Sequence, residues 1–239
     1  MSLLPILYGI TLFLVATTTI ADVTIAGTRI IFPSTAKSVS VQLNNIGDQP
    51  ALIQAWLDDG DPKIILENPQ LPLMVIPSLT RLEPKKGQQL RVIPKAVSLL
   101  PQDKESLFWF NILDIPPIAQ AEVGENKLRI SIRSRIKLFY RPTGLKPSLE
   151  TAFKSLTFKY QPTLQAVEIS NPSPYYMSLN KLIYLAVGKQ KNYNTSLMIA
   201  PFSSEKLRQS ELDLQQNQQI SYEVINDNGS SEIFSTVIQ

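Results

Sequence analysis

A ribbon of alternating apolar and cationic residues is the most distinctive chemical feature of this chain. Within residues 128–142, Leu128, Ile130, Ile132 and Ile136 alternate with arginines, serines and a lysine. Successive side chains of a β-strand point to opposite faces, so this pattern gives one apolar face and one mostly cationic face. We therefore predict a strand that binds a partner, and we expect an anionic group on its cationic side.

Composition excludes most catalytic chemistry. The chain has no cysteine and no histidine, which removes thiol nucleophiles, disulfides, Cys/His zinc sites and imidazole catalysis. No phosphate-binding Gly-Lys-Ser/Thr loop occurs, so ATP is not expected. The net charge of +3 is too mild for a nucleic-acid binder. We expect no enzyme, no catalytic residue, no metal and no cofactor.

The first 21 residues have the character of a secretory signal peptide. They contain no charged side chain, and an apolar run at 6–16 precedes small residues that end at Ala21. A membrane anchor is the alternative, but the run is short for a bilayer and is broken by Pro5 and Gly9. Export without cysteine suits a bacterial periplasm or a cell surface. We predict residues 1–21 to be a signal peptide cleaved after Ala21.

The remaining chain is patterned as a β protein. Eighteen prolines against nine glycines, with 44% hydrophobic residues, favour an all-β chain with real cores. A break with two prolines and a glycine at 141–147 divides two series of short strands. We predict two antiparallel β-sandwiches, residues 22–141 and 142–239. The expected strands are 23–32, 39–44, 51–57, 89–93, 107–112, 128–140, 156–160, 166–170, 176–179, 182–187, 220–225 and 233–238.

Several short sequence motifs occur in order along almost the whole chain. They include Thr28-Arg29-Ile30-Ile31, Arg81-Leu82-Glu83-Pro84, Glu105-Ser106-Leu107-Phe108-Trp109-Phe110-Asn111-Ile112, Ile115-Pro116-Pro117, Arg135-Ile136-Lys137-Leu138-Phe139-Tyr140-Arg141-Pro142, Asn171-Pro172-Ser173-Pro174-Tyr175-Tyr176 and Ile225-Asn226-Asp227-Asn228-Gly229. Together these motifs resemble a known family, the periplasmic pilus-assembly chaperones. The short-loop subclass of that family is the better match, because residues 119–127 form a short segment and cysteine is absent.

The resemblance implies two immunoglobulin-like β-sandwich domains set at an angle, with a cleft between them. It also implies a periplasmic chaperone that captures pilus or fimbrial subunits by lending a strand to an incomplete subunit sandwich, and that passes them to an outer-membrane usher. The candidate donor residues are Leu128, Ile130 and Ile132, whose period of two suits successive pockets. Taken alone, the same alternation also fits a strand that faces its own core.

The resemblance assigns roles to two further groups of residues. Arg29 and Lys137 match a basic pair that holds the subunit's terminal carboxylate; ordinary solvated charges at sheet edges are the alternative. Lys137 has the opposite parity to Leu128 and Ile130, so we expect a bulge or strong twist between Ile132 and Lys137. The second group, Glu105, Arg141 and Asp227, matches an ion-pair network between the domains.

Other interpretations stay open at this point. A structural or adhesive surface subunit built from the same sandwiches would polymerise or bind a ligand by itself, and a glycoside hydrolase would need two facing acids that the sequence does not identify. An exposed apolar edge also invites pairing, which leaves self-association of the free chain open. Asp58-Asp59-Gly60-Asp61 lacks the spaced ligands of a calcium loop and is interpreted as a solvated turn.

Overall fold

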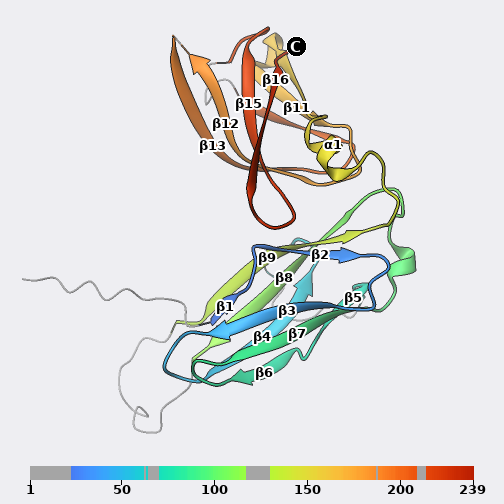
Figure 1. Cartoon of the computed structure of the whole chain (residues 1–239), viewed down its shortest axis with the longest axis vertical. Helices are drawn as coiled ribbons and strands as arrows, with labels where there is room; N and C mark the ends of the chain where they lie inside the picture. Colours follow the sequence, from blue (N-terminus) through green and yellow to red (C-terminus); the bar gives the residue numbers. More distant parts are fainter. Residues whose placement is uncertain (1–22, 62, 64–69, 117–129, 187, 209–213) are drawn as a thin grey trace, which may run out of the picture.

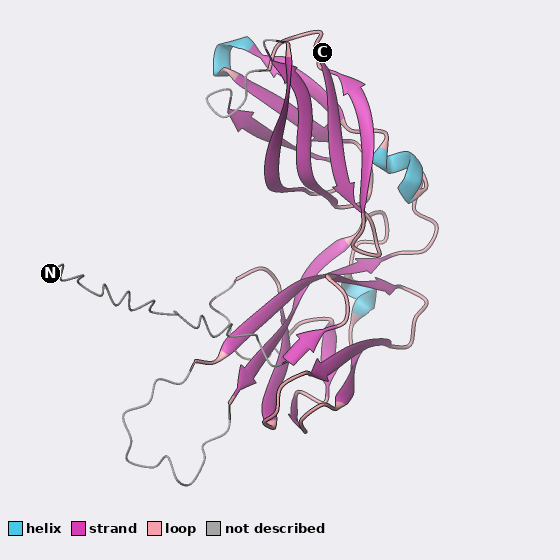
Figure 2. Cartoon of the chain, turned by 60° about the vertical axis from the view of Figure 1, so that its left-hand side comes forward, coloured by secondary structure: helices cyan, strands magenta, loops and turns pink. Residues whose placement is uncertain are grey.

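The computed structural model describes residues 23–61, 63, 70–116, 130–186, 188–208 and 214–239. These residues form two β-sandwiches that follow one another along the chain and meet at an angle (Figures 1 and 2). The predicted all-β fold with two immunoglobulin-like domains is confirmed. No helix in the described part of the chain is long and apolar enough to cross a membrane. The predicted signal peptide lies outside the described residues.

The N-terminal sandwich packs a four-stranded sheet, β1-β3-β7-β5, against a five-stranded sheet, β2-β9-β8-β4-β6. Alternate residues of both sheets point inward to one apolar core, which includes the fully buried Phe32, Leu43 and Phe110. The strands are β1 (Val23–Ile25), β2 (Arg29–Pro33), β3 (Val39–Asn45), β4 (Ala51–Asp58), β5 (Leu73–Ile76), β6 (Leu79–Leu82), β7 (Gly87–Pro94), β8 (Ser106–Ile115) and β9 (Ile132–Arg141).

The C-terminal sandwich has a separate core between the sheets β10-β11-β14 and β13-β12-β15-β16. The short helix α1 (Leu149–Phe153) precedes it and is capped by the side chain of Ser148, which accepts a hydrogen bond from the Thr151 N–H. The strands are β10 (Thr157–Gln161), β11 (Ala166–Asn171), β12 (Met177–Ala186), β13 (Lys189–Ile199), β14 (Ser203–Arg208), β15 (Gln219–Ile225) and β16 (Ser231–Val237).

Four strands were not among those expected from the sequence: β5, β6, β13 and β14. All four lie at sheet edges, where a strand needs no clear apolar alternation, and in β6, β13 and β14 polar residues discourage aggregation. The two runs expected at 176–179 and 182–187 form one strand, β12, with a register shift between Leu179 and Lys181. Such a shift interrupts the period of two that a sequence pattern depends on.

The N-terminal segment changes sheets between β1 and β2. β1 pairs with β3 in the four-stranded sheet, and β2 then crosses to the other sheet, where it pairs with β9 in parallel. Gly27, with a φ of +104°, lies at this crossing. Its left-handed backbone is one that residues with a Cβ rarely adopt. The crossing makes β2 the edge strand beside the last half of β9.

Candidate functional site

Two cations face each other across the parallel β2–β9 pair. Arg29, the first residue of β2, is the cross-strand neighbour of Lys137, so both side chains leave the same face of the sheet. The next pair, Ile30 and Leu138, points the other way and is buried in the N-terminal core. The structure therefore brings the two predicted anchor residues together on the face that looks away from that core.

Neither cation has a carboxylate partner among the described residues. Arg29 donates from Nη1 to the Ile225 carbonyl at 2.8 Å, while its buried Nε makes no hydrogen bond with the described residues. Lys137 donates from Nζ to Ser178 Oγ at 3.2 Å. Burial, followed by the positive charge of Arg29, lowers the pKa of the Lys137 ammonium to about 8. Two adjacent, partly desolvated cations form a site suited to an anion.

β9 has an open edge directly before this pair. β8 pairs with β9 along residues 132–140, whereas β2 pairs only with residues 137–141. On the β2 side, no described strand pairs with residues 132–136, and we call this stretch the open edge. Its backbone groups can accept a further strand, as exposed sheet edges do.

The candidate donor residues lie at the start of this edge. Ile130 precedes β9 and is 67% exposed, and Ile132 begins the strand and is 40% exposed. Leu128 lies outside the described residues. Farther along, Ile136 packs against the N-terminal core and Leu138 is buried in it. The apolar side of β9 therefore changes from exposed to core-facing partway along the strand.

Of the bulge or strong twist expected between Ile132 and Lys137, the bulge is absent. The β8–β9 register runs without a shift from Asp114↔Ile132 to Ser106↔Tyr140. Lys137 and Ile132 therefore project from opposite faces. No bulge is required, because the terminal carboxylate of a strand added beside β9 would lie in the plane of the sheet, where a side chain from either face can approach it.

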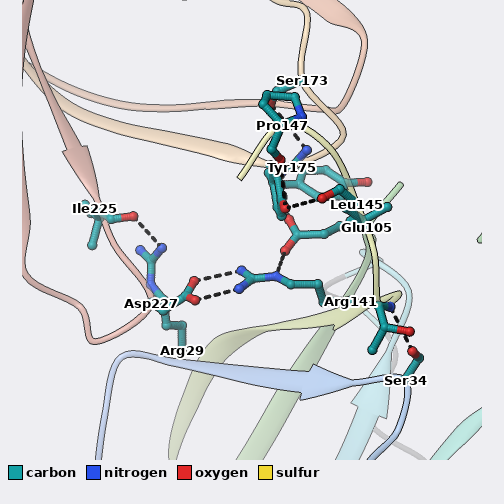
Figure 3. Close-up of polar contacts among 12 residues, drawn as sticks. Arg29, Ser34, Glu105, Arg141, Leu145, Pro147, Ser173, Tyr175, Ile225 and Asp227 are labelled. Carbon is teal, nitrogen blue, oxygen red and sulfur yellow. Dashed lines mark hydrogen bonds and ion pairs between the residues drawn. The ribbon is translucent and has the colours of Figure 1, made fainter. Parts of the chain in front are cut away.

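Arg141 links the two sandwiches, as Figure 3 shows. Its Nε donates to Glu105 at 2.6 Å, and its two terminal nitrogens donate to Asp227 at 2.6 and 2.7 Å. Burial raises the pKa of the Glu105 carboxyl against the opposing pull of Arg141. Burial alone would lower the Arg141 pKa, but the hydrogen bonds with Asp227 and the charge of Glu105 raise it. The three predicted ion-pair residues thus lie in direct contact.

Other contacts at this junction were not anticipated from the sequence. The Tyr176 N–H donates to Glu105 at 2.8 Å. The ring of Tyr176 lies 5.7 Å from the ring of Phe139, measured between ring centres. Phe139 is buried although its side chain points away from the N-terminal core. The β15–β16 loop reaches β2 (Figure 1), and Gly229, at φ +81°, lies so close to Thr28 that a Cβ would collide with it.

The cationic side of β9 differs from expectation at Arg133 and Arg135. Both arginines form ion pairs with Asp58, whose side chain is completely buried. The interpretation of Asp58 as part of a solvated turn was therefore wrong, because the two guanidinium groups cover it. Of the described cations on β9, Lys137 is the one that has no ion pair with the described residues.

Two family models match consecutive parts of this chain. Residues 22–146 match the N-terminal domain of the PapD pili and flagellar-assembly chaperones, and residues 151–235 match the C-terminal domain of the PapD pili assembly chaperones. The chain belongs to the pilus-assembly chaperone family. The resemblance stated from its sequence words is confirmed.

Curated relatives that are named as chaperones align with this chain over most of their length. The chaperone protein FimB/FhaD of Bordetella pertussis is 42% identical over 193 residues, which cover 79% of this chain and 78% of the relative. The probable fimbrial chaperone YadV of Escherichia coli is 38% identical over 221 residues, covering 90% and 89%. These matches place the family assignment across both sandwiches.

Solved structures agree with both the fold and the family. The crystal structure of the YadV chaperone superposes with a TM-score of 0.77 at 35% identity, covering 91% of this chain and all of that one. The SafB chaperone of Salmonella enterica, solved in complex with the SafA pilin, superposes with a TM-score of 0.76 at 26% identity, covering 92% and 98%. That relative was thus captured while holding a pilin.

Proposed function

We propose that this chaperone binds a pilus or fimbrial subunit by completing the subunit's sandwich with β9, and that Arg29 and Lys137 bind the subunit's terminal carboxylate. The observation that carries the proposal is the position of the two unpaired cations at the end of the open edge. A strand added to that edge would be collinear with β2. Because its C-terminus would meet Arg29, where β2 begins, the added strand would run parallel to β9.

The carboxylate would fix the register of the added strand. Two charge-assisted hydrogen bonds define where the strand ends, and each of its residues is then paired with a set position on β9. On the other face, Leu128, Ile130 and Ile132 would enter the incomplete core of the subunit. Burial of three such side chains contributes roughly 1.5–3 kcal/mol each before the cost of association. Binding of that strength permits later release to a better strand.

The contacts between the sandwiches would hold the two domains, 22–141 and 142–239, at a fixed angle around the subunit. Arg141 is the central residue, since it bridges a carboxylate from each domain. Transfer to an outer-membrane usher would follow, driven by more complete folding of the subunit in the fibre. Residues 1–21 would direct export to the periplasm; a structural neighbour, SfaE, is described as a periplasmic chaperone.

The test is capture of subunits in the native host. The tagged chaperone is purified from the periplasm, and the proteins that accompany it are identified by mass spectrometry. We expect small β-rich secreted proteins with the wild type and none with Lys137→Met. Lys159→Met, at an exposed position on β10, is the matched control and should capture normally. Recovery of the wild type alone or as its own polymer would instead favour a surface subunit.

A synthetic peptide gives the second test. The probe is a 12-residue peptide of alternating valine and threonine, prepared with a free C-terminal carboxylate or with a C-terminal amide. The wild type should bind the free acid at least about tenfold more tightly, since charge-assisted hydrogen bonds are lost with the amide. Equal binding of the two forms by the wild type would eliminate the carboxylate anchor.

A further inference from the structure

A buried carboxylate on the outward face of the five-stranded sheet fastens β9 to its neighbours. Asp58 of β4 lies 2.5 Å from Arg135 Nη2 and 3.2 Å from Arg133 Nη2. Asn111 of β8 donates to Asp58 at 2.8 Å and accepts from Arg133 at 2.7 and 3.0 Å. We call these four residues the Asp58 cluster.

Two tryptophans support the arginines of the Asp58 cluster. The guanidinium carbon of Arg133 lies 5.0 Å from the ring centre of Trp56, and that of Arg135 lies 4.0 Å from the ring centre of Trp109. Each arginine thus stacks on an aromatic face while it donates to the cluster, and each side chain is only 22% exposed. Burial opposes ionisation of Asp58, but hydrogen bonds from Arg135, Asn111 and the Gly60 N–H hold its pKa below the usual value.

The Asp58 cluster acts where other side-chain support for β9 is weak. Along the open edge, residues 132–136, Ile132 is 40% exposed and Ile136 is only partly buried against the core. Full burial of inward side chains begins at Leu138. The backbone ladder to β8 holds one side of this stretch, and no described strand holds the other. A strand with one ladder and little core contact tends to open locally.

We propose that the Asp58 cluster is a positioning device that keeps residues 132–136 of β9 extended and in register before a subunit arrives. Its members are positioning residues, since their side chains lie on the face opposite to the donor side chains and are occupied with one another. A pre-ordered edge lowers the entropy cost of adding a strand, because the backbone is fixed already. This inference rests on the proposed function, in which that edge receives the subunit.

The test combines amide hydrogen exchange with peptide binding in the full-length mature protein. Asp58→Asn keeps the shape of the side chain but removes its charge. We expect amides of residues 132–136 to exchange at least about tenfold faster, while those of 138–140 in the same strand keep their protection. The free-acid peptide should bind about tenfold more weakly, mostly through slower association, which is the cost of ordering about one further backbone residue.

Two further variants keep the result interpretable. Glu223→Gln removes a comparably buried ion-paired carboxylate from the C-terminal sandwich and should change neither measurement. If Asp58→Asn fails to fold, Arg135→Gln removes one arm of the cluster and should give the same two effects in smaller measure.

Three results would overturn the inference: unchanged exchange at 132–136, faster exchange spread evenly over the whole N-terminal sandwich, or faster local exchange with unchanged binding. Failure of the proposed function has a different signature. In that case Lys137→Met, which leaves the Asp58 cluster intact, would bind the free-acid peptide as well as the wild type does. The two failures are therefore separable in one set of proteins.

Discussion

At the scale of single residues, Lys137 combines the charge of the proposed carboxylate anchor with an unfavourable environment. Burial, followed by the charge of Arg29, lowers its pKa to about 8. A bound carboxylate would favour the charged form and raise that pKa, so binding should take up protons near and above pH 8. Affinity for the free-acid peptide should therefore fall as the pH rises from 7 to 9.5.

This pH dependence can be measured by titration calorimetry in buffers of different ionisation enthalpy. Lys137→Arg is the matched control, because a guanidinium stays charged over this range and its binding should be nearly flat with pH. The amidated peptide should show no slope with either protein. Equal slopes for the wild type and Lys137→Arg would show that another group titrates.

The lowered pKa of Lys137 also predicts that stability depends on pH in the opposite direction to peptide affinity. The folded pKa lies below the ordinary value of 10.5, so the unfolded chain binds the proton more tightly. The free energy of unfolding should rise with pH between about 8 and about 10.5, and below pH 8 the charged lysine destabilises the fold in full. Lys137→Met should increase that free energy at pH 7 by about 1–2 kcal/mol, after allowance for solvent screening. Urea unfolding checks this, and a destabilised variant would contradict it.

The roles of individual residues were the hardest feature to predict from the sequence. Arg29 and Lys137 come together only because β2 crosses between sheets and pairs in parallel with β9. No local period predicts that pairing, so these residues were found through resemblance to a family. Asp58 was missed because its acidic, glycine-containing surroundings are typical of a turn, while the two arginines that cover it lie 75 and 77 positions away. Long-range ion pairs of this kind leave no local signal.

At the scale of elements, the surroundings of β9 change along its length. Ile130 is exposed near the start, and Ile136 packs against the core. Ile130→Asp should weaken peptide binding by roughly 1.5 kcal/mol or more, the value of a buried aliphatic side chain, with a stability change within about 0.5 kcal/mol. Ile136→Asp places a charge against the core and should destabilise the domain by several kcal/mol. Urea unfolding and peptide binding of both variants separate the two effects; a large loss of stability from Ile130→Asp would show that this residue faces its own core.

Many elements were predictable because strands with one buried face carry a period of two, as in β3 and the first half of β4. The open edge was not predictable, since the sequence pattern of β9 is the same whether a neighbouring strand is present or absent. The exposed start and the buried end of β9 also show the same alternation of apolar and polar residues, so the sequence does not tell them apart. Only the topology distinguishes the two ends of β9, because β2 begins at Arg29 and pairs with β9 only from Lys137 onward.

At the scale of the whole molecule, we expect the angle between the sandwiches to depend on a small number of polar contacts around Arg141. Glu105 is 3% exposed and accepts hydrogen bonds from both Arg141 and the Tyr176 N–H. Arg141→Leu would leave a buried carboxylate without its cation, which is destabilising by about 3–5 kcal/mol. It would also release Asp227, and with it the β15–β16 loop. The two apolar cores, which do not include these residues, should remain folded.

Arg141→Leu should therefore loosen the junction rather than unfold either domain. In small-angle X-ray scattering we expect a broader distribution of interatomic distances and a larger maximum dimension, and in calorimetry two transitions in place of one cooperative transition. Arg81→Leu is the control, because it removes an exposed ion pair with Glu83 inside one domain, and exposed pairs contribute little. A variant that scatters like the wild type would show that the Phe139–Tyr176 contact and the chain linking the domains fix the angle without Arg141. Subunit capture should fall when the junction loosens, because the proposed anchor, Arg29 and Lys137, would no longer be held at a fixed position relative to the C-terminal sandwich.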